Sequence, residues 1–241
     1  MDIFILLLIV VLISLLPVNN NYLNVKSTNG LKGFLALGIV FHHLSQWVTT
    51  GVEFSNFNYM GTYTVSAFFF LSGYGLYIQN ERKEGYLDNF LVKRLSRVIV
   101  PVIFVSGIYI VYFISNKYVI TINYFINLFV KGSTIIANGW FVDVIILLYV
   151  CFYVSFKIFS NRTIAILVNT ILIVGYIILA TKLGYDFWWY NSSLPFALGL
   201  IWAKYNKEID KVLSDYYFIC IILVTCLLFI SHQYSFILKK L

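Results

Sequence analysis

Two residues on one predicted helix could carry out acid–base chemistry. Lys32 and His43 are eleven positions apart, a rotation of about 1,100°, so on a helix they share one face about 16 Å apart along the axis. A neutral imidazole can accept a proton near pH 7, which suits His43 to act as general base for a hydroxyl nucleophile. The alternative is structural: Lys32 would reach the membrane surface and His43 would face a neighbouring helix. His42 lies about 100° around the helix, so we predict a structural role for it.

A second group of candidates is basic. Lys93, Arg94 and Arg97 occupy positions i, i+1 and i+4, so they share one face of a helix. Such a face can hold phosphate groups through charge-assisted hydrogen bonds. The same residues can also fix the orientation of the chain in a membrane. Both roles stay open, because a cytoplasmic anchoring segment is also where an anionic ligand from the cytoplasm would bind.

Acidic and small residues give weaker signals. Asp143 follows Trp140 by three residues and could orient an imidazole, pair with a cation or reach the outer headgroups. Glu53 lies in a segment without basic residues and is a candidate for contacting a substrate. Residues 72–75, Ser-Gly-Tyr-Gly, resemble a potassium-channel filter only superficially, because an uninterrupted apolar stretch precedes them. We predict that Gly73 and Gly75 allow close helix packing instead.

The composition identifies the environment of these residues. Of the 241 residues, 61% are hydrophobic and 11% are charged, whereas soluble domains contain about 25% charged residues. We therefore expect an all-α, polytopic integral membrane helix bundle. Eight apolar stretches come near the length that crosses a bilayer core of about 30 Å. They cover residues 3–18, 31–48, 62–78, 98–115, 140–159, 163–180, 188–203 and 216–231.

The positive charge follows membrane topology. If the N-terminus is extracytoplasmic, twelve of the 17 Lys and Arg residues fall in cytoplasmic segments and five fall outside, as the positive-inside rule requires. Segment 79–97 is then cytoplasmic, and residues 1–30 form an additional anchor helix and loop. We expect a multi-pass protein of the cell membrane that contacts lipids and binds no nucleic acid. The three cysteines lie in apolar stretches without metal-ligand spacing, so neither a disulfide framework nor a metal site is predicted.

The residues around Lys32 and His43 resemble a family signature. Residues 31–43, Leu-Lys-Gly-Phe-Leu-Ala-Leu-Gly-Ile-Val-Phe-His-His, are similar to the opening signature of the acyltransferase-3 family of membrane O-acyltransferases. In that signature a basic residue, usually Arg, precedes a His with ten residues between them. Further segments resemble family motifs in the same order, namely Phe-Phe-Leu-Ser-Gly-Tyr at 69–74, the basic stretch 90–101, Trp-Phe at 140–141 and, more weakly, 193–199.

The resemblance implies an enzyme that moves an acetyl or other acyl group from acyl-coenzyme A to a hydroxyl of a cell-surface or lipid-linked carbohydrate. Acetyl-coenzyme A would be the co-substrate, and no metal is implied. The implied roles are catalysis for His43 and Lys32, coenzyme binding for Lys93, Arg94 and Arg97, and acceptor binding for Trp140, Glu53 and Asp143.

We expect a single acyltransferase-3-like domain over residues 1–241, with its best match over 31–141 and an incomplete C-terminal part. Lys32 stands where the family usually has Arg, which keeps the charge but loses the bidentate fork. The alternatives are an inactive truncated acyltransferase and a transporter or flippase-like bundle for a lipid-linked sugar, because ionisable residues within the membrane also suit a transport path.

Overall fold

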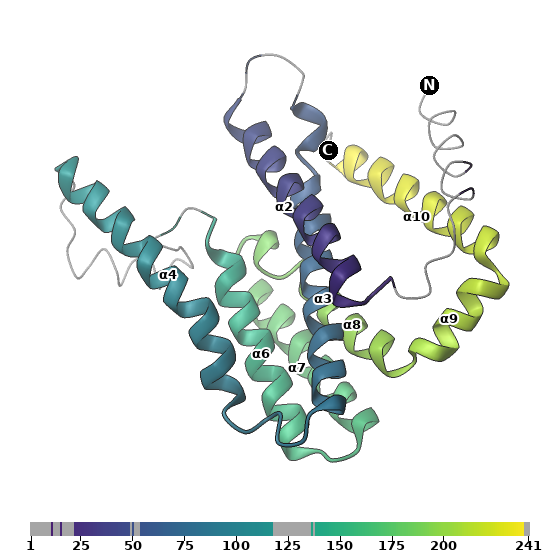
Figure 1. Cartoon of the computed structure of the whole chain (residues 1–241). Helices are drawn as coiled ribbons and strands as arrows, with labels where there is room; N and C mark the ends of the chain where they lie inside the picture. The colour runs from purple at the N-terminus through teal and green to yellow at the C-terminus, as the bar shows by residue number, and fades with distance from the viewer. Residues whose placement is uncertain are drawn as a thin grey trace. The chain divides into compact units, whose positions relative to one another are not determined.

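The computed structural model describes residues 11, 15, 22–48, 50, 54–117, 136 and 138–238. These residues contain helices and no strand, which confirms the predicted all-α helical membrane bundle. The helices are α2 (Val25–Trp47), α3 (Met60–Arg82), α4 (Phe90–Ser115), α6 (Trp140–Ile158), α7 (Arg162–Lys182), α8 (Leu194–Lys204), α9 (Asn206–Asp215) and α10 (Tyr217–Leu238) (Figure 1). The chain divides into two compact units, one of residues 28–204 and one of residues 1–27 with 205–241.

Fewer membrane spans are evident than the eight predicted. Within the described residues, α4, α6 and α7 are long and apolar enough to cross a bilayer. Helices α2, α3 and α10 coincide with three other predicted stretches. The predicted span 3–18 lies almost wholly outside the described residues.

The predicted span 188–203 is wrong. It divides into a 3-10 turn, Phe187–Trp189, and the eleven-residue helix α8. Eleven helical residues extend about 16 Å, roughly half of the apolar core of a bilayer. Pro195 is the second residue of α8, a position where proline costs no helical hydrogen bond, because the N–H groups of the first turn have no partner within the helix. Proline thus favours a helix that begins here rather than one that passes through.

The core of unit 28–204 is built by α3, α6, α7 and α8. Its most deeply buried apolar side chains are Phe69, Leu76, Val144, Leu148, Phe152, Ile173, Phe196 and Leu200. Helix α4 contributes Phe90, whose ring stacks on Tyr153 at 6.1 Å between centroids. Other apolar side chains of α4, such as Phe104, are exposed. An apolar exposed face suits contact with lipid.

Two glycines bring α3 and α8 into backbone contact. A Cβ atom added at Gly73 would lie 2.1 Å from the carbonyl oxygen of Phe196, and one added at Gly199 would lie 2.1 Å from that of Phe70. Any side chain at either position would therefore push the helices apart. The predicted packing role of Gly73 is confirmed. The prediction for Gly75 is wrong, because among the described residues no atom of another element lies within 4 Å of its added Cβ.

Candidate active site

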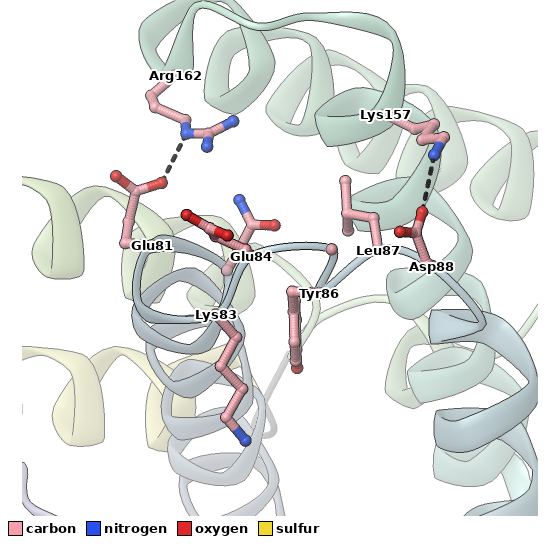
Figure 2. Close-up of a pocket in the computed structure, with 10 residues that line it drawn as sticks. Glu81, Lys83, Glu84, Tyr86, Leu87, Asp88, Lys157 and Arg162 are labelled. Atoms are coloured by element: carbon pink, nitrogen blue, oxygen red, sulfur yellow. Dashed lines mark hydrogen bonds and ion pairs between the residues drawn. The ribbon is translucent and has the colours of Figure 1, made fainter.

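Contacts between connecting segments define a basic end of unit 28–204. The connection from α3 to α4 meets the turn from α6 to α7 there. Arg162 Nε lies 2.6 Å from Glu81 Oε1, and Lys157 Nζ lies 3.3 Å from Asp88 Oδ1 (Figure 2). Lys204, the last residue of α8, donates a hydrogen bond to Thr163. These contacts bring basic side chains of three helices, α6, α7 and α8, to one end of the unit.

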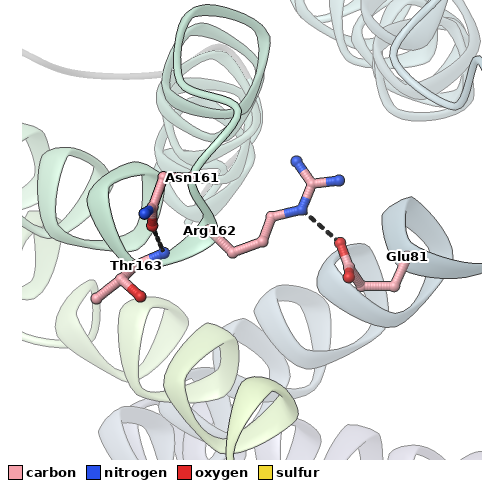
Figure 3. Close-up of polar contacts among 4 residues, drawn as sticks. All are labelled: Glu81, Asn161, Arg162 and Thr163. Carbon is pink, nitrogen blue, oxygen red and sulfur yellow. Dashed lines mark hydrogen bonds and ion pairs between the residues drawn. The ribbon is translucent and has the colours of Figure 1, made fainter.

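A helix cap sets the position of Arg162. The side-chain oxygen of Asn161 accepts hydrogen bonds from the backbone N–H of Thr163 at 2.9 Å and of Ile164 at 3.3 Å. This N-cap satisfies two amides that have no partner within the helix. It starts α7 at Arg162, whose side chain then extends toward Glu81 (Figure 3).

A pocket of about 370 Å³ lies at this end (Figure 2). The pocket is lined by equal numbers of acidic and basic side chains. The acidic ones are Glu81, Glu84 and Asp88, and the basic ones are Lys83, Lys157 and Arg162. A balanced lining does not by itself favour an anion. None of the three residues predicted to bind coenzyme lines this pocket.

Those three predicted coenzyme-binding residues lie on the first two turns of α4. Lys93 and Arg97 are exposed, while Arg94 is half-buried. The guanidinium of Arg94 donates a 2.6 Å hydrogen bond to the hydroxyl of Tyr86 and lies over its ring at 5.9 Å. The first turn of α4 contains no acidic residue, and the N-terminus of a helix carries partial positive charge. The exposed surface there is therefore positive and open to an anion.

The two adjacent histidines of α2 have different surroundings at the other end of α3. A Cβ atom added at Gly61 would lie 2.5 Å from Cδ2 and Nε2 of His42, so this imidazole packs directly against the start of α3. His42 therefore has the structural position predicted for it.

His43 turns to another part of the molecule. Its Nδ1 lies 3.2 Å from Oε1 of Gln46 and 3.4 Å from Nδ2 of Asn138. Asn138 adopts a left-handed conformation with φ of 60° and lies two residues before Trp140. The structure thus brings the predicted base beside the segment that starts α6.

The remaining predicted site residues, Trp140, Asp143, Lys32 and Glu53, are not brought into one cluster by the described contacts. Trp140 begins α6 and packs against the core, and Asp143 lies exposed in the first turn of that helix. Lys32 shares α2 with His43, as predicted, and is exposed. Among the described residues, no interaction connects Lys32 with the basic side chains of α4. Glu53 lies outside the described residues.

The sequence interpretation missed three residues of the histidine end. Gln46 follows the histidines by four and three positions, a helical spacing that places it within reach of both. That signal was present in the sequence. Nothing in the sequence indicated that Gly61 would make room for His42 or that Asn138 would approach His43, because both contacts depend on tertiary packing.

Comparison with known proteins gives the family. The family model described as the acyltransferase domain of the acyltransferase-3 family matches residues 25–238, well beyond the motifs at 31–141. No curated protein and no solved structure matches the chain. The matched region covers most of the 241 residues and contains both the basic end and the histidine end. The chain belongs to the acyltransferase-3 family and is a membrane acyltransferase.

Proposed function

We propose that this membrane acyltransferase transfers an acetyl group from acetyl-coenzyme A to a hydroxyl of a cell-surface or lipid-linked carbohydrate. The observation that supports this best is the position of His43. Its imidazole is held through Nδ1 by side chains of α2 and of the segment before α6. Its Nε2 is left as the atom that can take a proton.

The proposed reaction is a direct transfer. The hydroxyl oxygen of the acceptor attacks the carbonyl carbon of the thioester while Nε2 of His43 removes the hydroxyl proton. The carbon–sulfur bond then breaks, and the imidazolium returns that proton to the departing sulfur. The products are an O-acetyl ester and coenzyme A with a free thiol, so atoms and charge balance. Such a base contributes about 10²–10⁴-fold to the rate.

The donor would bind first at the basic end. Its phosphate groups would be held by Lys93, Arg94 and Arg97 through charge-assisted hydrogen bonds. Lys32 would contact the coenzyme at a point closer to His43. Helix α3 has 23 residues and separates the two ends, a length of about 34 Å. The flexible arm of the coenzyme would therefore have to extend along the length of α3 to bring the thioester toward His43.

The acceptor would bind at the histidine end. The ring of Trp140 offers an apolar face for a sugar, and the carboxylates of Asp143 and Glu53 would accept hydrogen bonds from its hydroxyls. These three roles follow from family resemblance and, for Trp140 and Asp143, from their place at the start of α6.

Donor kinetics test the coenzyme site. Replacing both Arg94 and Arg97 with Gln removes two charges that would contact phosphate, so the apparent KM for acetyl-coenzyme A should rise while kcat changes less. Arg162→Gln is the matched control, because it removes a cation at the same end that is already paired with Glu81. An unchanged donor KM in the double variant, with only poorer membrane insertion, would restrict these residues to orienting the chain.

A binding measurement tests the donor itself. Acetyl-coenzyme A should raise the unfolding temperature of the purified protein, since a ligand that binds the folded state stabilises it. Dephosphorylated coenzyme A should give a smaller shift. Absence of any shift, together with no acetyl transfer to glycans, would contradict the proposed donor.

A further inference from the structure

We infer that Gln46 is a positioning residue that fixes the tautomer of His43, so that Nδ1 carries the proton and Nε2 is free to act as base. The inference deepens the proposed function, because it depends on His43 being the general base. It starts from one side-chain amide that contacts two imidazoles.

The contacts of Gln46 follow from helical spacing. Its Oε1 lies 3.2 Å from Nδ1 of His43, and its Nε2 lies 3.2 Å from Nε2 of His42. The two imidazole rings are 5.2 Å apart between centroids. Residues at i, i+3 and i+4 are neighbours on a helix surface, so the amide bridges both rings without leaving α2.

The chemistry of an amide assigns the protons. The oxygen of an amide only accepts hydrogen bonds, and its nitrogen only donates them. With the Gln46 oxygen facing it, Nδ1 of His43 donates to Oε1 of Gln46 and the lone pair is on Nε2, which requires the Asn138 amide to turn its oxygen toward Nδ1. Nε2 of His42 must accept from the Gln46 nitrogen, which places the proton of His42 on Nδ1.

His42 anchors this arrangement. Its ring rests on Gly61, where an added Cβ would lie 2.5 Å away, so the ring cannot turn toward α3. The fixed imidazole of His42 holds one end of the Gln46 amide, and the other end of that amide orients His43.

The reverse orientation of Gln46 would place the lone pair of His43 on Nδ1, where hydrogen-bond donors would occupy it. The amide nitrogen of Gln46 would then donate to Nδ1 of His43, and Nε2 would carry the proton. The amide nitrogen of Asn138 lies 3.4 Å from the same Nδ1, so two donors would surround the only basic nitrogen. The orientation with Oε1 of Gln46 facing His43 instead makes Nδ1 a donor, and the oxygen of a rotated Asn138 amide offers it a second acceptor.

Two substitutions separate these cases by kinetics. Gln46→Met keeps the size of the side chain and removes both contacts, so kcat should fall about 10–100-fold, the effect typical of groups that orient a functional histidine. KM for donor and acceptor should change little. Gln46→Glu keeps an acceptor for Nδ1 of His43 and should retain most of the wild-type kcat.

Ser45→Ala is the control, because within the described part of the chain the Ser45 hydroxyl bonds only to the backbone oxygen of His42, at 2.6 Å. All variants would be compared at equal amounts in the membrane. Wild-type kcat in Gln46→Met, or a Gln46→Glu variant as impaired as Gln46→Met, would overturn the inference.

A second measurement does not depend on activity. The chain has three histidines, so nitrogen NMR of histidine-labelled protein in lipid bilayers can resolve them, with His43 assigned by its loss in His43→Ala. A protonated Nδ1 and bare Nε2 on neutral His43, lost in Gln46→Met, would support the inference. A protonated Nε2 in the wild type would overturn it. The expected tautomer without acyl transfer would contradict the proposed function while leaving the role of Gln46 intact.

Discussion

At the scale of residues, two adjacent imidazoles are separated by the geometry of one helix. Successive residues point about 100° apart, so His42 packs against Gly61 while His43 faces Gln46 and Asn138. An imidazole pressed against a neighbouring backbone cannot approach a substrate. The half-buried imidazole of His43 can, which is why its substitution should affect the reaction rather than the fold.

The first prediction compares these two residues. His43→Ala should lower kcat by about 10²–10⁴-fold, the usual contribution of a general base, with normal amounts of protein in the membrane. His42→Ala should mainly reduce thermal stability, because it leaves a cavity beside Gly61, and the loss of its contact with Gln46 should lower kcat far less than His43→Ala does. Acetylated glycan from cells that express each variant at equal abundance would measure the difference.

The pH dependence gives a further readout of the same variants. A base must be unprotonated to act, so kcat/KM of the wild type should fall toward acidic pH. This lower limb should disappear in His43→Ala. Near-normal acetylation by His43→Ala, or loss of acetylation only in His42→Ala, would show that the base is assigned to the wrong residue.

At the scale of elements, the sequence predicts helices better than their partners. Helices α6 and α7 begin within one residue of their predicted starts, since each follows a clear boundary such as the N-cap Asn161. The stretch around α8 was predicted as one span interrupted by Pro195, and hydropathy alone does not show that the helix there has only eleven residues. Gly73 approaches Phe196 and Gly199 approaches Phe70, residues 123 and 129 positions apart, and one sequence gives no indication of such pairs.

The second prediction tests that contact. Gly73→Ala and Gly199→Ala each place a Cβ 2.1 Å from a carbonyl oxygen of the opposite helix, so each should destabilise the protein by about 1–3 kcal/mol, as overpacking does. Gly75→Ala is the control, because no atom of another described element lies within 4 Å of its added Cβ. It should be neutral or stabilise the helix by about 0.5–1 kcal/mol.

Thermal unfolding of the detergent-solubilised variants measures these differences. Equal unfolding temperatures for Gly73→Ala and Gly75→Ala would show that α3 and α8 are not in backbone contact at Gly73. A loss of stability in Gly199→Ala alone would show that the close contact is between Gly199 and Phe70 and not between Gly73 and Phe196.

At the scale of the whole unit 28–204, the two ends differ in chemistry. The basic end joins the α3–α4 connection, the α6–α7 turn and the end of α8 through Glu81–Arg162, Asp88–Lys157 and Lys204–Thr163. The histidine end joins α2 to Asn138 and joins Thr62 of α3 to Asn191 at 3.4 Å. The distribution of Lys and Arg along the sequence predicted that basic residues would gather at one end. It did not predict these contacts, because ion pairs between connecting segments depend on how the helices pack.

The last prediction concerns the orientation of these ends. An excess of basic residues marks the cytoplasmic side of a membrane protein, so the basic end, with residues 82–97, should be cytoplasmic and residues 51–60 extracytoplasmic. Helix α3 has 23 residues and extends about 34 Å, enough to separate the two segments by a bilayer core of about 30 Å. Such an orientation would give the donor site access to coenzyme A and the acceptor site access to surface glycans.

Single cysteines introduced into a variant without Cys151, Cys220 and Cys226 would test the orientation in intact cells. Ser55 and Glu84 are exposed at opposite ends of α3, so Ser55→Cys and Glu84→Cys form a matched pair. An impermeant thiol reagent should label Ser55→Cys in intact cells and Glu84→Cys only after permeabilisation, because the bilayer blocks the reagent. The opposite pattern would invert the topology and place the basic end outside. The donor site on α4 would then be untenable, because coenzyme A in the cytoplasm could not reach it.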